Sequence, residues 1–144
     1  MVVGKVKRKA AISLSGEKML GFVAYIISKF LIEMERKIQE REGSEREVTE
    51  ILYGELQRIV FEELPREQRL ALFDSEEEFK AALKALSECG IIEYDEKRNV
   101  VKIRDRRALE RIAKLISGSP FRHEVKLYDE YVRRIDRAVE ATVK

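Results

Sequence analysis

Residues Ser75–Arg104 read SEEEFKAALKALSECGIIEYDEKRNVVKIR and carry the start, stop and turn signals of a helix followed by a β-hairpin. Asp74 or Ser75 can accept a hydrogen bond from a free N–H of the first helical turn, and a glutamate lies three residues after each, so either register completes a capping box. Gly90 is expected to end the helix, because glycine adopts the left-handed conformation without steric cost. Apolar residues recur between these signals at helical spacing, namely Phe79, Ala82, Leu83 and Leu86.

Two short apolar runs follow the glycine, residues 91–94 and 100–103, and both predict β-strands. The segment between them, Asp95–Asn99, is polar and predicts the turn of a hairpin. Asn99 suits such a turn because asparagine tolerates a positive φ. The stretch therefore predicts a capped helix and a two-stranded hairpin in direct succession.

The phrase ALKALSECGIIEYDEKRNVVKI (residues 82–103) resembles the third helix and the wing of archaeal and bacterial winged helix-turn-helix domains. The resemblance covers residues 45–105 and rests on element order and apolar spacing. It implies a first helix at Glu47–Leu64 and a short second helix at Glu67–Phe73, separated by Pro65. It also implies a DNA-binding function, and dimerisation through flanking helices, which regulators of this superfamily often use.

The expected fold is mainly α with a small β-hairpin: a winged helix-turn-helix core with a long N-terminal helix and a C-terminal helical extension. Residues 1–44 would form a basic N-terminal arm plus the long helix, residues 45–105 the core, and residues 106–144 the C-terminal helices, all in one compact domain. Side chains that favour the N-cap position predict where the other helices begin: at Ser15, Ser44, Asp105 and Ser119.

The composition limits which classes of protein fit. The chain has 144 residues, 44% of them hydrophobic and 39% charged, with a formal net charge of +2. Positive and negative residues are interleaved, which predicts a surface rich in ion pairs, as in heat-loving organisms, and we expect an archaeal, thermophilic source. Nucleic-acid binders more often show a clear basic excess, so the charge must be considered locally.

Several classes of site find no support in the sequence. Cys89 is the only cysteine and His123 the only histidine, so no intramolecular disulfide or thiolate metal cluster can form, and a reducing, cytoplasmic location is the simplest expectation. The apolar-rich run Met19–Met34 contains charged residues and is shorter than the roughly 20 apolar residues of a membrane span. P-loop, dinucleotide and nucleophile-elbow motifs are absent. We therefore expect no membrane association, no cofactor, no metal site and no enzymatic activity.

Basic residues form the candidate nucleic-acid interface. Between Asp95 and Arg107 the chain has six basic and three acidic residues, a local excess of +3, and wing cations commonly contact DNA phosphates. The N-terminal arm and the predicted third helix add further cations. The candidate residues are Lys5, Lys7, Arg8, Lys9, Lys80, Lys84, Lys97, Arg98, Lys102, Arg104, Arg106 and Arg107. The alternative is that these residues are an ordinary polar turn, solvated helix faces and a frayed terminus.

The start of the predicted third helix argues against base reading by this helix. DNA-reading helices place their N-terminal residues against base edges, but here that end is Glu76–Glu78. These carboxylates would be repelled by phosphates and suit the positive end of the helix dipole. The alternative function is therefore a winged-helix protein-interaction or scaffold module whose acidic helix meets a basic partner, without direct DNA binding.

The flanking helices suggest a second interface. Six helices and one small sheet leave more apolar helix face than one small core readily covers, and two-fold packing between copies is the commonest solution. A homodimer is therefore expected, with contacts at Phe22, Ile26, Phe30, Tyr128 and Tyr131.

Overall fold

The computed structural model describes residues 2–63, 73 and 75–118 and, near the C-terminus, residues 126, 127, 129, 130, 132–134, 136 and 137. These residues are mainly helical and include one small antiparallel sheet, so the coarse fold class is confirmed. The elements in chain order are α1 (Val2–Glu42), β1 (Glu50–Leu52), α2 (Tyr53–Gln57), the π-helical segment η1 (Arg58–Glu63), α4 (Glu76–Glu88), β2 (Ile92–Asp95), β3 (Val100–Ile103) and α5 (Arg106–Ser117).

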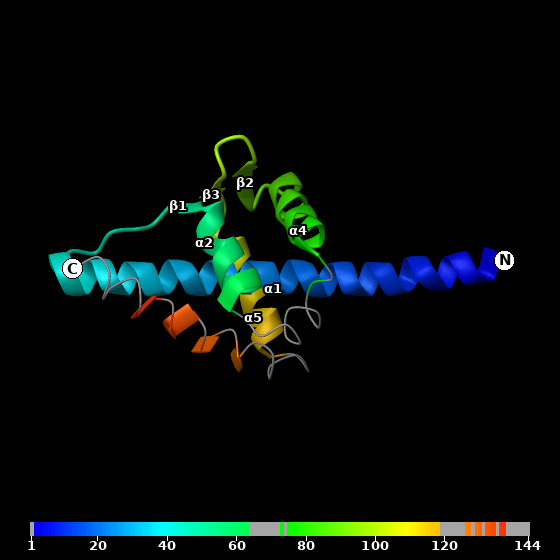
Figure 1. Ribbon diagram of the computed structural model, residues 1–144, viewed down its shortest axis with the longest axis horizontal. Helices are drawn as coiled ribbons and strands as arrows, with labels where there is room; N and C mark the ends of the chain where they lie inside the picture. The colour runs from blue at the N-terminus through cyan, green and yellow to red at the C-terminus, as the bar shows by residue number, and fades with distance from the viewer. Residues whose placement is uncertain are drawn as a thin grey trace.

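The longest element is α1, whose 41 residues span roughly 60 Å at 1.5 Å per residue. Figure 1 shows α1 running the length of the molecule, with the hairpin and α4 on one side and the described C-terminal residues on the other. The prediction that this helix begins at Ser15 is wrong, because the helix is already formed at Val2. A serine inside a helix costs only a few tenths of a kcal/mol relative to good helix formers, so a capping side chain does not by itself start a helix.

The sheet has three strands in the order β1-β3-β2, one more than the predicted hairpin. Glu50 lies opposite Lys102 in the register of β1 with β3. The N–H of Ile103 donates to the carbonyl of Thr49 just before β1, at 2.8 Å. The first part of the predicted helix Glu47–Leu64 is therefore wrong: these residues pair with β3, and helical structure begins only at α2.

The second predicted helix, Glu67–Phe73, lies almost entirely outside the described residues. Phe73 is described, and it is not helical. The last predicted helix begins at Ser119, also outside the described residues, although all of the nine described residues after Gly118 are helical.

The signals around the hairpin are confirmed. Ser75 Oγ accepts a hydrogen bond from the N–H of Glu78 at 3.3 Å, which caps α4. Gly90 and Asn99 have φ angles of 79° and 54°, as the helix end and the turn require. Asp105 Oδ1 accepts from the N–H of Ala108 at 3.0 Å and caps α5. These are local contacts between residues at most three positions apart, which explains why the sequence predicts them.

The core lies where α1 packs against α4 and α5, and it also includes Ile51, Ile92 and Val101 of the sheet. The α1–α5 crossing is close at Gly21, where a Cβ would lie 2.4 Å from side-chain carbons of Ile116. On the inner face of α4, Phe79 is fully buried and makes edge-on contacts with Phe73 and Phe61, at ring-centroid distances of 5.4 and 5.7 Å. The aromatic contacts hold α4 against η1 and Phe73, while α4 also packs on α1 and on β2.

Two glycines give a prediction about the backbone. A Cβ at Gly54 or at Gly90 would meet no atom within 4 Å, but Gly90 has a positive φ and Gly54 lies in α2. We expect Gly54→Ala to stabilise the protein by about 0.4–1 kcal/mol and Gly90→Ala to destabilise it by about 1–2 kcal/mol. Urea unfolding of both variants measures the difference, and a Gly90→Ala variant as stable as the wild type would contradict the left-handed helix end.

Candidate nucleic-acid interface

The outer face of the hairpin is electrically balanced. Lys102 Nζ lies 3.8 Å from Glu50 Oε1 and 3.9 Å from Glu93 Oε2. Arg104 forms an ion pair with Glu93 as well. Because each of these cations already faces a carboxylate on a neighbouring strand, Lys102 and Arg104 add little net positive potential to the predicted interface.

Arg106 links α5 to α1. Its Nη1 and Nη2 donate to the two oxygens of Glu35 at 2.5 and 2.7 Å, and its Nε donates to Glu110 at 3.0 Å. These hydrogen bonds raise the pKa of Arg106, and the hydrogen bond from Arg106 is the largest cause that lowers the pKa of Glu35. Glu35 also accepts from the N–H of Val48 at 2.8 Å. A guanidinium held in this way joins three segments, and its charge already faces the two carboxylates of Glu35 and Glu110.

The two lysines of α4 are paired. Lys80 Nζ lies 3.9 Å from Glu76 Oε1 and 5.7 Å from the centroid of the Tyr53 ring. Lys84 Nζ lies 3.2 Å from Glu96 Oε1, at the hairpin turn. Both lysines connect α4 to neighbouring elements and are partly compensated.

The first turn of α4 is acidic, as predicted. Glu76, Glu77 and Glu78 occupy it, and Glu77 is exposed. Glu76 is held in place, because Gln57 Nε2 donates to its Oε2 at 2.6 Å. The end of α4 that would approach DNA in a base-reading helix therefore has an acidic surface.

Two groups of exposed cations on the hairpin and α5 have no ion pair with a described residue, and we call them the turn patch and the α5 patch. The turn patch consists of Lys97 and Arg98, which are exposed and whose side chains have no ion pair with a described residue. On α5, the exposed side chains among those described are Arg107, Arg111, Lys114 and Leu115. The α5 patch consists of the three cations of this set, and none of them has an ion pair within the described part of the chain.

Arg111 and Lys114 are residues that the sequence reasoning missed. Together with Arg107 they follow an i, i+4, i+7 spacing on the predicted helix after Asp105, which places them on one face. The spacing was visible in the sequence, but the solvent exposure of that face became clear only from the packing of Leu109, Ala113 and Ile116 against the core.

The predicted basic arm is helical. Lys5, Lys7, Arg8 and Lys9 lie within the first eight residues of α1, and Figure 1 shows this end of α1 (dark blue) extending beyond the other labelled elements. The side chains of these four residues lie outside those that the structure describes. Their role in DNA binding stays a prediction.

The predicted dimer contacts on α1 are core residues. Phe22 and Ile26 have no exposed surface and Phe30 is 4% exposed in the single chain, so they present no apolar face to a second copy. Their placement at a dimer contact is corrected: these three residues belong to the core of the single chain, in which α4 and α5 pack against α1. Tyr128 and Tyr131 lie outside the described residues.

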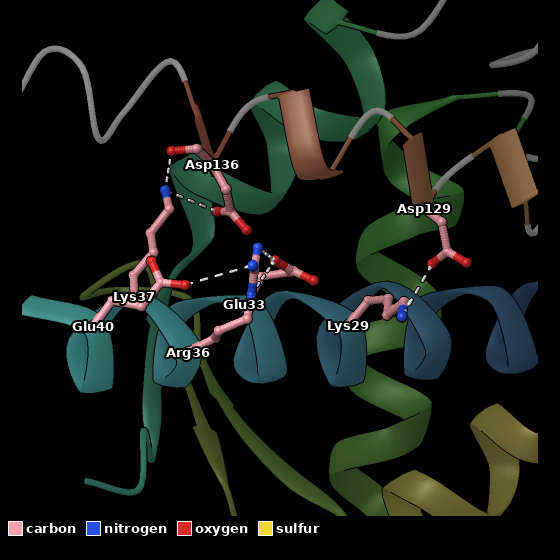
Figure 2. Close-up of polar contacts among 7 residues, drawn as sticks. All are labelled: Lys29, Glu33, Arg36, Lys37, Glu40, Asp129 and Asp136. Atoms are coloured by element: carbon pink, nitrogen blue, oxygen red, sulfur yellow. Dashed lines mark hydrogen bonds and ion pairs between the residues drawn. The ribbon is translucent and has the colours of Figure 1, made fainter. Parts of the chain in front are cut away.

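A buried polar contact joins α1 to the C-terminal residues, and sequence reasoning missed it. Figure 2 shows Lys37 reaching Asp136: its Nζ lies 3.5 Å from Oδ1 and donates to the backbone carbonyl. Lys29 Nζ lies 3.7 Å from Asp129 Oδ1 in the same view, and the Tyr25 hydroxyl donates to Asp129 Oδ1 at 2.5 Å. The residue numbers of the two partners increase together, from Lys29 with Asp129 to Lys37 with Asp136. The C-terminal residues therefore run parallel to this part of α1.

Asp136 has the largest pKa shift among the carboxyl groups that the structure describes. It is 3% exposed, Lys37 is 8% exposed, and Asp136 Oδ2 has no hydrogen-bond partner among the described residues. Burial raises the pKa of Asp136 to about 6, while Lys37 opposes the shift and the charge of Glu33 adds to it. Glu33 is itself paired with Arg36 at 2.5 Å. The contact therefore places two charged groups in the interior, and one carboxylate oxygen of Asp136 has no hydrogen bond with a described residue to offset its loss of hydration.

Comparison with known proteins identifies no relative. No family model matches the chain, and no curated protein and no solved structure matches it either. Within the described ranges there is no group of three or more His, Cys, Asp or Glu side chains placed to hold a metal ion. None of the described helices combines the length and the apolar character needed to cross a bilayer.

Proposed function

We propose that this protein binds double-stranded DNA, as a winged-helix protein of the transcriptional-regulator type. The observation that carries the proposal is the placement of uncompensated, exposed cations at the turn patch and the α5 patch. The capped α4 followed directly by the β2–β3 hairpin supports the winged-helix part, because the resemblance rests on this element order. In this proposal the hairpin turn is the tip of the wing.

The chemistry of the two patches suits phosphate. Lysine and arginine side chains that lack a carboxylate partner can each replace a counterion condensed on the duplex. Five cations in contact with phosphates, those of both patches, correspond to a slope of log K against log salt concentration of about −4.5. Lys102, Arg104 and Arg106, which already face carboxylates, are not needed for this value.

Replacement of two cations in each patch tests whether the protein binds DNA through them. We expect the double variants Lys97→Gln/Arg98→Gln and Arg107→Gln/Arg111→Gln each to weaken duplex binding and to reduce the magnitude of the salt slope by about two, because each removes two phosphate contacts. Fluorescence anisotropy with a labelled mixed-sequence duplex, from about 50 to 200 mM salt, measures both quantities.

A control variant separates local contacts from net charge. Lys126→Gln/Arg133→Gln removes the same number of charges from exposed positions on the C-terminal segment, and we expect it to leave the salt slope unchanged. Equal effects in all three double variants would mean that only the overall charge matters. Absence of wild-type binding at about 50 mM salt would reject DNA binding.

A second function, capture of a basic protein partner, is favoured by one observation. The exposed surface at the start of α4 is acidic, and the cations nearby on α4 are paired. In that case the wild type would not bind the duplex at low salt, and the first turn of α4 would be the contact. A cytoplasmic location fits both functions, since the single cysteine suits a reducing compartment.

A further inference from the structure

The orientation of α4 restricts how DNA is recognised. A helix that reads base edges in the major groove has its N-terminal residues close to the two phosphate backbones. On α4 these residues are Glu76, Glu77 and Glu78, and Glu76 accepts from Gln57 on α2 at 2.6 Å. Because Gln57 and Lys80 hold the Glu76 side chain, it is not free to turn away from an approaching phosphate.

The same carboxylates are favourable while α4 stays outside the groove. They lie at the positive end of the helix dipole, where negative charge stabilises the helix. Insertion into the groove would leave this interaction in place and would add repulsion between the carboxylates and the phosphates on both sides. The cations of the turn patch and the α5 patch lie on the hairpin turn and on the solvent face of α5, away from the first turn of α4.

We infer that the protein binds duplex DNA through its phosphates and without sequence preference. The inference rests on the proposed function, which is DNA binding. It adds that the protein binds any duplex and does not recognise a particular base sequence. Contacts to phosphates fix the position of a protein on the duplex but carry no sequence information directly. The turn patch and the α5 patch consist of side chains suited to phosphate, and the helix that would read bases in a winged-helix domain is kept out of the groove by its own charge.

Three duplexes of equal length test this inference: one of A·T pairs only, one of G·C pairs only and one of mixed sequence. We expect dissociation constants within about threefold of one another and equal salt slopes, whereas specific binders discriminate by roughly 10³ or more. A preference above about 100-fold for one duplex would overturn the inference and leave the proposed function intact. Failure to bind any of the three at low salt would reject the proposed function itself.

A matched pair of variants reports whether α4 enters the groove. Glu77→Gln removes an exposed carboxylate at the start of α4, and Glu88→Gln removes one at its end. If α4 stays outside, both variants bind all three duplexes within about twofold of the wild type. If Glu77→Gln alone strengthens binding by about tenfold, or creates a preference among the duplexes, α4 lies in the groove and the inference is wrong.

Discussion

Replacement of Lys37 by methionine is expected to lower the free energy of unfolding by about 3–5 kcal/mol, because it leaves a buried charge without its partner. Lys37 contacts the Asp136 carboxylate and its backbone carbonyl, and both residues are more than nine-tenths buried. Asp136 already has a pKa raised to about 6 by burial, and Lys37 is the main influence that opposes this shift. Without Lys37 the carboxyl group would have to be protonated or the C-terminal segment would have to leave α1.

The double variant Lys37→Met/Asp136→Leu is expected to recover the loss. The double variant has no buried charges, so no cost of desolvation remains, and two apolar side chains of similar size fill the space. The unfolding free energy should therefore be near the wild-type value or higher by about 1–4 kcal/mol. Chemical denaturation of the wild type, the single variant and the double variant supplies the three values. A double variant as unstable as Lys37→Met would contradict the account of the pair.

An exposed ion pair provides the control. Lys84 and Glu96 lie 3.2 Å apart, but their side chains are 59% and 52% exposed. Exposed pairs contribute about 0–1 kcal/mol, so we expect Lys84→Met to have a small effect. Similar losses for Lys37→Met and Lys84→Met would show that burial does not decide the cost.

Truncation of Phe79 to alanine is expected to lower the unfolding free energy by about 3–5 kcal/mol, the usual cost of removing a large buried aromatic side chain. Phe79 is fully buried, and its ring contacts those of Tyr53, Phe61 and Phe73. The cavity would lie between α4 and the segment α2–η1, so the change also removes much of what holds α4 against the rest of the fold.

The matched control for Phe79→Ala is Leu115→Ala on α5. Leu115 is 74% exposed, so its truncation should change the unfolding free energy by no more than about 0.5 kcal/mol. Urea unfolding compares the two variants under the same conditions. A loss below about 1 kcal/mol for Phe79→Ala would mean that the aromatic cluster is not packed as described.

Sequence reasoning succeeded where the deciding contacts are short-range. The Ser75 cap, the left-handed Gly90 and Asn99, and the Asp105 cap depend on side chains and backbone groups a few residues apart. The same reasoning failed at Ser44, where a helix was expected to begin but the next helix begins only at Tyr53. The residues after Ser44 are held instead by distant partners: Val48 by Glu35, and the strand β1 by β3.

In the candidate interface, too, the sequence predicted local features but not the contacts between distant segments. Sequence placed Lys97, Arg98 and Arg107 among the candidate cations, and the structure leaves them exposed and without an ion pair in the described part of the chain. The sequence alone could not distinguish these unpaired cations from Lys102 and Arg106, which form ion pairs. The carboxylate partners of Lys102 and Arg106 lie up to 71 positions away along the chain. Local charge counts treat all basic residues alike, whereas the net potential depends on which carboxylate each one faces.

The sequence by itself determined the capped helix α4, the hairpin and the cap of α5, because hydrogen bonds and backbone preferences within a few residues are sufficient to specify them. Only the tertiary structure decided that residues 50–52 form a strand, that Phe22, Ile26 and Phe30 are core, and that Lys37 and Asp136 share a buried site. The physical reason is that strand pairing, burial and ion pairing are contacts between segments. A local pattern leaves their partners open until the whole chain has packed.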